Sequence, residues 1–261
     1  MCLLVLAWQV HPRYRLIVAA NRDEFHERPT EAMSRWTDED GGIVAGRDLR
    51  AGGTWLGMDR LRRFGVVTNF RELQRPAPQA SSRGNLIPDY LRNPAGARGY
   101  LESLQAGAPS YSGFNLLLSD RESLWYASNR AETFARPLSP GIYGLSNEFL
   151  DTPWPKLQRV RRRFDPLVMQ PGSIPREELF DILADPTQAG VDDELPGTGL
   201  SREWEQLLSS PFIRNKDYGT RCSTVVLHES EGRLLITERR FDREGTVIGD
   251  TEVRLDADEW P

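Results

Sequence analysis

Cys2 is the residue whose position most directly suggests chemistry. If Met1 is removed, Cys2 carries both a thiol and a free α-amine, so a nucleophile and a base coincide on one residue. An α-amine titrates near ~7.7–8.0, so at neutral pH it can accept the thiol proton directly or through water. The alternatives are that Cys2 is a small buried apolar residue or a lipidation site.

The chain that follows Cys2 has the pattern of a β-hairpin. Residues 2–8 and 15–20 are apolar runs separated by a turn at Pro12, which is typical of strands buried on both faces. If the hairpin turns about Pro12, the numbers of paired residues sum to roughly 24 or 25. Cys2 is then expected opposite residues 22–23.

A charged tetrad, Asn21 to Glu24, therefore lies beside the start of the chain. Strand alternation places Asn21 and Asp23 on one face, and Arg22 and Glu24 on the other. Asp23, if it faces Cys2, could hold the α-amine or orient a substrate, while a nearby cation favours thiolate over thiol. A solvated turn at the end of a strand is the structural alternative.

Two asparagines and a tryptophan occur where strands are expected to end or bend. Asn69 and Asn147 each follow an apolar stretch, and a neutral amide N–H can stabilise an oxyanion without titrating. Asparagine also simply favours turns. Trp55, within the glycine-rich segment 52–57, could form a pocket wall where the backbone approaches a ligand, or the segment could be a bulge.

Arg221 immediately precedes an apolar stretch at residues 223–228. Its guanidinium could bind a carboxylate or help to lower the pKa of Cys2. A surface ion pair is the alternative role for such a residue.

The composition argues against several classes of partner and site. The net charge of −5 and the pI near 5.4 give no general attraction to nucleic acid or to an anionic membrane, so we expect a small-molecule partner. No window approaches the ~18 apolar residues of a membrane span. Two cysteines favour a reducing compartment, and we expect a cytoplasmic protein. Three scattered histidines and no paired-cysteine motif predict no metal site and no resident cofactor.

Strands and helices are expected in blocks, in the order sheet, helices, sheet, helices, sheet. Strands are expected at 43–46, 54–58, 64–69, 114–119, 123–127, 142–145, 223–228, 234–237 and 251–255, and helices near 86–91, 97–105, 151–164, 176–183 and 202–208. This order predicts an α+β fold in which two stacked antiparallel sheets are covered by helices on both outer faces, a four-layer αββα sandwich. Without a repeat or a long linker, residues 1–261 are expected to form a single domain.

The tetrad Asn21-Arg22-Asp23-Glu24 is the signature of the NRDE family, which includes the transport and Golgi organisation proteins, and the chain resembles this family along nearly its whole length. The other matching motifs are Met1-Cys2, Ala19–Phe25 with Arg28-Pro29, Gly52–Gly57, Thr68-Asn69, Arg83-Gly84, Gly113–Leu116, Tyr143–Asn147, Thr152–Trp154 with Lys156-Leu157, Tyr218–Arg221 and Thr237–Arg239.

That family in turn resembles the N-terminal-nucleophile hydrolases of the choloylglycine and penicillin acylase type, whose fold is an αββα sandwich. The resemblance implies catalytic roles for Cys2, Asp23, Asn69, Asn147 and Arg221. It also implies substrate contacts, for which the candidates are Asn21, Arg22, Trp55 and Asn115. Those hydrolases carry an arginine three residues before the aspartate, where this chain has Ala20, and Arg22 is expected to point away from the aspartate's side of the strand.

Two functions of different classes follow. In the first, the Cys2 thiolate attacks the carbonyl of an amide or thioester, the two asparagines stabilise the oxyanion and the α-amine shuttles the proton. In the second, the protein is a non-catalytic carrier or trafficking protein that binds haem or an acyl-CoA or other lipid, and Cys2 is a ligand or only packs.

Overall fold

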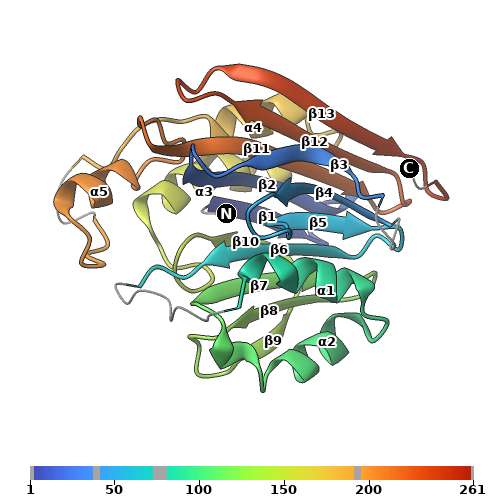
Figure 1. The fold of residues 1–261 in the computed structure, drawn as a ribbon. Coiled ribbons are helices and arrows are strands. Elements are labelled where there is room, and N and C mark those ends of the chain that lie inside the picture. Colours follow the sequence, from blue (N-terminus) through green and yellow to red (C-terminus); the bar gives the residue numbers. More distant parts are fainter. Residues whose placement is uncertain (1–2, 38–41, 73–80, 191–194, 260–261) are drawn as a thin grey trace.

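Two antiparallel sheets form the centre of the molecule (Figure 1). The computed structural model describes residues 3–37, 42–72, 81–190 and 195–259. The first sheet has the order β10-β1-β2-β11-β12-β13, with bounds Leu3–Trp8 (β1), Tyr14–Phe25 (β2), Gly141–Leu145 (β10), Tyr218–Glu229 (β11), Leu234–Phe241 (β12) and Val247–Leu255 (β13). The second runs from β3 to β9 in sequence order, with bounds Thr30–Arg35 (β3), Ile43–Asp48 (β4), Leu56–Asp59 (β5), Phe64–Asn69 (β6), Phe114–Ser119 (β7), Leu124–Ser128 (β8) and Ala135–Leu138 (β9).

Helices cover the outer faces of the two sheets (Figure 1). α1 Leu86–Arg92 and α2 Gly96–Leu104 pack on the second sheet, and α3 Pro155–Val168 and α4 Arg176–Leu183 pack on the first. α5 Arg202–Leu207 lies apart from these layers (Figure 1), and short 3-10 turns are found at Arg83–Asn85 and Ala108–Ser110. One apolar cluster lies between the sheets, a second joins β1, β2 and β11 to α3 and α4, and a third joins the second sheet to α1 and α2. The expected four-layer αββα sandwich is therefore confirmed. No helix in the described ranges is long and apolar enough to cross a membrane.

In the first hairpin, the residue numbers of each pair sum to 24, one of the two values expected from the sequence. Leu3 pairs with Asn21 and Trp8 pairs with Leu16, and all six residues of β1 are buried. Strands buried on both faces were expected here, and the reason is that the inter-sheet cluster lies on one side of β1 and the cluster with α3 on the other. Cys2 lies outside the described residues, and the described part of β1 begins with the next residue, Leu3.

Several strands, among them β2 and β11, extend further than expected, and two strands were missed. β2 continues to Phe25 and β11 begins at Tyr218, so the charged tetrad is paired inside the sheet instead of ending it. β3 was missed because only one of its six residues is buried and it lacks an apolar run. β9 was missed because it is a four-residue edge strand that contains Pro137.

A buried carboxyl links the two sheets. Glu238 on β12 accepts a hydrogen bond from the backbone N–H of Met33, 2.7 Å away, where the pairing of β3 with β4 is irregular. The thiol of Cys222 is also hydrogen-bonded to Glu238. Burial raises the pKa of Glu238 above its ordinary value even though these hydrogen bonds oppose the shift.

His228 on β11 is buried at the opposite end of that strand from the charged tetrad. Burial lowers its pKa to about 4, and the nearby guanidiniums of Arg15, Arg62 and Arg121 act in the same direction. The folded protein therefore keeps His228 neutral at a pH where an exposed imidazole would bind a proton.

This buried imidazole predicts a specific loss of stability in acid. Between pH 6.5 and pH 4 the unfolded chain binds a proton on this residue and the folded chain does not, so the free energy of unfolding falls as the pH falls. From the two pKa values the contribution of this group is about 2–3 kcal/mol. Urea unfolding of the wild type and of His228→Leu at pH 7 and pH 4.5 measures it. The stability difference between the two proteins should shift by that amount in favour of the variant at low pH, and equal shifts for both proteins would contradict the account.

Candidate functional site

Two adjoining cavities open at the end of the sandwich where the charged tetrad lies. The first, here called the polar chamber, has a volume of about 260 Å³ and is lined by the charged side chains Arg22, Glu24, Arg28, Asp48 and Arg83, with Trp55. The second, here called the apolar chamber, has a volume of about 400 Å³, and its apolar lining consists of Phe25, Phe70, Leu200, Trp204, Leu208 and Tyr218. Asn69, Arg83 and Ser112 line both chambers and so mark their junction.

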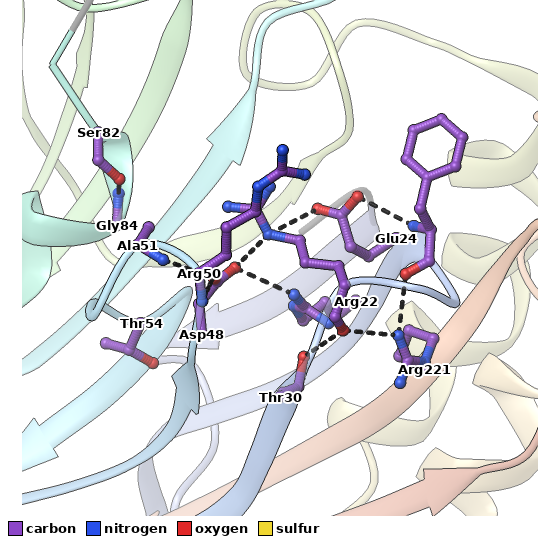
Figure 2. Close-up of polar contacts among 12 residues, drawn as sticks. Arg22, Glu24, Thr30, Asp48, Arg50, Ala51, Thr54, Ser82, Gly84 and Arg221 are labelled. Atoms are coloured by element: carbon purple, nitrogen blue, oxygen red, sulfur yellow. Dashed lines mark hydrogen bonds and ion pairs between the residues drawn. The ribbon is translucent and has the colours of Figure 1, made fainter.

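Asp48, at the end of β4, is the centre of the charged contacts in the polar chamber (Figure 2). Its Oδ2 accepts hydrogen bonds from Arg28 Nε at 2.5 Å and from Arg22 Nη2 at 3.4 Å, and its Oδ1 accepts the backbone N–H groups of Arg50 and Ala51. Burial alone would raise the pKa of Asp48, but the hydrogen bonds from Arg28 and Ala51 outweigh it, and the pKa lies below its ordinary value. Asp48 is therefore ionised and fully engaged by the chain.

Arg22 points into the polar chamber. Its side chain is 3% exposed, and its guanidinium carbon lies 4.3 Å from the centre of the Trp55 ring. The expected alternation along β2 is observed, because Arg22 and Glu24 line the chamber while Asn21 and Asp23 bond elsewhere. The face of Arg22, and not that of Asp23, is therefore directed at the polar chamber.

Asn21 and Asp23 hold β2 to its neighbours. The amide of Asn21 donates to the carbonyls of Leu183 and Pro211 at 2.9 Å each and accepts from the hydroxyl of Ser223 at 2.6 Å. The carboxyl of Asp23 accepts from the hydroxyl of Thr220 at 2.7 Å, next to the irregular pairing of β2 with β11. Neither residue lines a chamber, so Asn21 is not placed to contact a ligand in either one.

The two asparagines proposed as oxyanion donors come together. Asn69 is the last residue of β6, Asn147 follows β10, and the side-chain amide of Asn147 donates to the carbonyl of Asn69 at 3.1 Å. Both line the apolar chamber, and Asn69 also lines the polar one. Among the described residues, no hydrogen-bond partner is found for the side-chain amide of Asn69. That amide is therefore available to a ligand at the junction.

Asn115 and Arg221 lie outside both chambers. Asn115 is fully buried, donates to Thr68 and to the carbonyl of Glu148, and accepts from the hydroxyl of Tyr126. Its amide is used to fix the loop after β10.

Arg221 donates to the carbonyls of Phe25, His26 and Arg28 at 3.0–3.3 Å, and so closes the turn after β2 (Figure 2). The structure supports a positional role for this residue and for Asn115, instead of ligand contact.

Several chamber residues had no role in the sequence-based hypothesis. Arg28 and Arg83 lie in motifs shared with the NRDE family, Arg28-Pro29 and Arg83-Gly84, and that signal could have marked them. Asp48 and Trp204 follow no recognisable pattern, because they reach the site only through long-range packing.

The apolar wall is held in place by a buried ion pair. Arg71 Nη1 lies 3.1 Å from the carboxyl of Glu205 on α5, and both side chains are largely buried. Glu205 also accepts the backbone N–H of Thr198 at 2.8 Å. The ion pair fixes α5, whose Trp204 makes an edge contact with Tyr218 across the chamber lining.

The wall of the polar chamber depends on the close approach of two glycines. A Cβ on Gly53 would lie 2.2 Å from the carbonyl oxygen of Gly84, and the neighbouring Thr54 N–H donates to that oxygen at 3.0 Å. The glycine-rich segment therefore permits contact between two parts of the chain, and Trp55 forms the chamber wall as expected.

Comparison with known proteins identifies relatives of this chain. The family model for Transport and Golgi organisation 2 matches residues 1–243. The "Transport and Golgi organization 2 homolog" of Mus musculus is 32% identical over 259 residues, and the corresponding Homo sapiens protein is 32% identical over 258, each match covering 92% of both chains. These matches confirm the resemblance found in the sequence.

A solved structure of a distant protein has the same fold. The Caenorhabditis elegans N-acylethanolamine-hydrolyzing acid amidase ortholog matches with a TM-score of 0.52 and 12% identity, covering 87% of this chain and 92% of its own. At this identity the match shows the fold alone. The expected αββα sandwich is therefore shared with this amidase.

The contact between Gly53 and Gly84 predicts a position that does not tolerate a methyl group. Gly53→Ala must displace backbone in the wall of the polar chamber, and we expect it to lower the free energy of unfolding by about 1–3 kcal/mol. Gly107→Ala is the matched control, because its Cβ would meet nothing closer than 3.7 Å and its φ is −89°. Urea unfolding measures both variants. Equal stability of the two would contradict the proposed close packing.

Proposed function

This chain belongs to the Transport and Golgi organisation 2 family, and we propose that it is a cysteine-type acyl-transfer enzyme that acts on an amide or thioester of a small molecule. The observation that carries the proposal is the side-chain amide of Asn69, which has no hydrogen-bond partner among the described residues and lies at the junction of the two chambers beside Asn147. The pairing of Leu3 with Asn21 supports it, because Cys2 precedes Leu3 in the sequence and Arg22, the residue after Asn21, lines the polar chamber.

The proposed reaction has two steps. The Cys2 thiol transfers its proton to its own α-amine, and the thiolate attacks the carbonyl carbon to form a C–S bond. The amide of Asn69 donates to the resulting oxyanion, and the C–N or C–S bond to the leaving group breaks as that group takes the proton. Water, or another acceptor, then attacks the acyl-enzyme and regenerates the thiol.

The mechanism predicts that the two cysteines differ in reactivity. Cys222 is buried, and burial together with the neighbouring Glu238 raises its pKa well above the ordinary value. A cysteine-directed electrophile near pH 7.5 should therefore label Cys2 rapidly and Cys222 only slowly in the folded protein. Intact mass with peptide mapping measures both, and also shows whether Met1 is removed. Retained Met1 with a slow Cys2 would contradict the nucleophile.

The oxyanion role predicts a loss of rate without loss of fold. Asn69→Ala should lower kcat by about 10²- to 10³-fold with little change in KM, because the amide acts mainly on the transition state. Initial rates on a panel of amides and thioesters measure the effect. Asn93→Ala, at the end of α1, is the control because it lines neither chamber. Loss of activity in Cys2→Ser but not in Asn69→Ala would remove Asn69 from the mechanism.

A carrier function is the second candidate, and the apolar chamber favours it. The described side chains that line the two chambers include no histidine, cysteine or methionine, so a haem ligand from them would have to be Tyr218. Cys2→Ser separates the candidates: it should abolish acyl transfer under the first, and leave ligand affinity nearly unchanged under a carrier in which Cys2 only packs.

A further inference from the structure

The guanidinium of Arg22 carries an unused hydrogen-bond donor. The residue is nine-tenths or more buried, its Nη2 reaches Asp48, and its buried Nη1 has no hydrogen-bond partner in the described part of the chain. Native proteins rarely keep a buried charged donor unpaired, because it loses its hydration without replacement. Since Arg22 lines the polar chamber, an acceptor bound there would satisfy it.

The remaining charges of the chamber define the acceptor. Arg28 uses Nε for Asp48, and its terminal nitrogens make no hydrogen bond to a described residue. The carboxylates Asp48 and Glu24 line the same chamber and compensate much of the charge of Arg22 and Arg28. Planar guanidiniums match the two oxygens of a carboxylate, and a chamber whose charges are already largely compensated suits a monoanion better than a dianion.

The apolar chamber begins where the polar chamber ends. Arg83 lines both, and beyond it the wall is formed by aromatic and aliphatic side chains that include Phe70 and Trp204. Phe25 and Tyr218 are in edge contact at 5.1 Å, and Trp204 continues this aromatic surface at 6.0 Å from Tyr218. A ligand whose anionic end lies at Arg22 therefore has an apolar surface to cover directly beside it.

We propose that the site takes a carboxylate-bearing amphipathic molecule, with its carboxylate on Arg22 and Arg28 and its apolar part against Trp204. The carbonyl that reacts then lies between these ends, at Asn69, so the substrate class is an amide or thioester of such a molecule. This assignment rests on the proposed function for its reacting bond, but the binding of the two ends does not require catalysis.

Equilibrium binding to the full chain with Cys2→Ala tests the assignment, because turnover through Cys2 is removed. The probes are dodecanoate, dodecan-1-ol and dodecyl phosphate below their micellar concentrations, followed by tryptophan fluorescence and calorimetry. We expect dodecanoate to bind at least tenfold more tightly than dodecan-1-ol and more tightly than dodecyl phosphate. Equal affinity for the acid and the alcohol, or tighter binding of the phosphate, would overturn the proposal.

Variants of the two ends complete the test. Arg22→Gln should weaken dodecanoate at least tenfold and leave dodecan-1-ol unchanged, whereas Trp204→Ala should weaken both. Arg28→Gln is a second charge variant at a partly exposed position, and should reduce the preference for the acid even if Arg22→Gln does not fold. Arg98→Gln, on an exposed surface pair with Glu102, is the control and should change nothing.

A third result separates this assignment from a role of Arg22 toward the thiol. The labelling of Cys2 is measured with Arg22→Gln in a chain that retains Cys2. If the labelling slows, and the same substitution leaves the affinity for dodecanoate unchanged, Arg22 stabilises the thiolate and the proposal is wrong. If the acid preference is observed while no amide or thioester is turned over, the ligand assignment stands and the enzymatic function fails.

Discussion

The placement of one guanidinium between two sheets is the constraint on which the site depends. Arg22 lies on β2, inside the first sheet, and points at the inter-sheet layer, where the residues that precede it on the same face, Val18 and Ala20, are apolar. A charge in that position is stable only with an acceptor and a polarisable surface, and Asp48 and Trp55 from the second sheet supply them. Trp55 fits because Gly46 has no Cβ, which would lie 2.5 Å from the indole ring.

Because Arg22 needs an acceptor, residues from distant parts of the chain come together in the polar chamber. Asp48 neutralises Arg22 and at the same time binds Arg28 and the backbone of the following turn (Figure 2). Arg221 holds the turn that carries Arg28 by donating hydrogen bonds to three backbone carbonyls. Sheet pairing, the charged cluster and the chamber are thus parts of one arrangement, in which the asparagines at the ends of neighbouring strands complete the junction.

Much of this could be predicted from the sequence, because the strongest signals were local. The register of β1 with β2 followed from the turn at Pro12, and the sandwich followed from strands that lack polar alternation. Which face of the tetrad is directed at a cavity was harder to predict. Alternation along the strand separates Arg22 from Asp23, but it does not say which of the two faces lines a cavity, since both faces of this strand are covered.

Other parts of the site leave no trace in the local sequence. Asp48 contacts Arg22 from the opposite sheet, and the ion pair of Glu205 with Arg71 holds the helix that carries Trp204. Such contacts join distant segments, so the pattern of a single segment does not predict them. Asn115 and Arg221 illustrate the converse, since a polar residue at a motif position can serve the fold by binding backbone carbonyls.

The central claim is that Cys2 becomes acylated, and trapping the intermediate tests it most directly. The full chain would be mixed with an activated thioester, quenched in acid within the first turnover, and analysed by intact mass and peptide mapping. The account predicts a single acyl group on Cys2, absent from Cys2→Ser and still formed in Cys222→Ala. An unmodified Cys2 in a chain that turns the thioester over, or the acyl group on another residue, would contradict it.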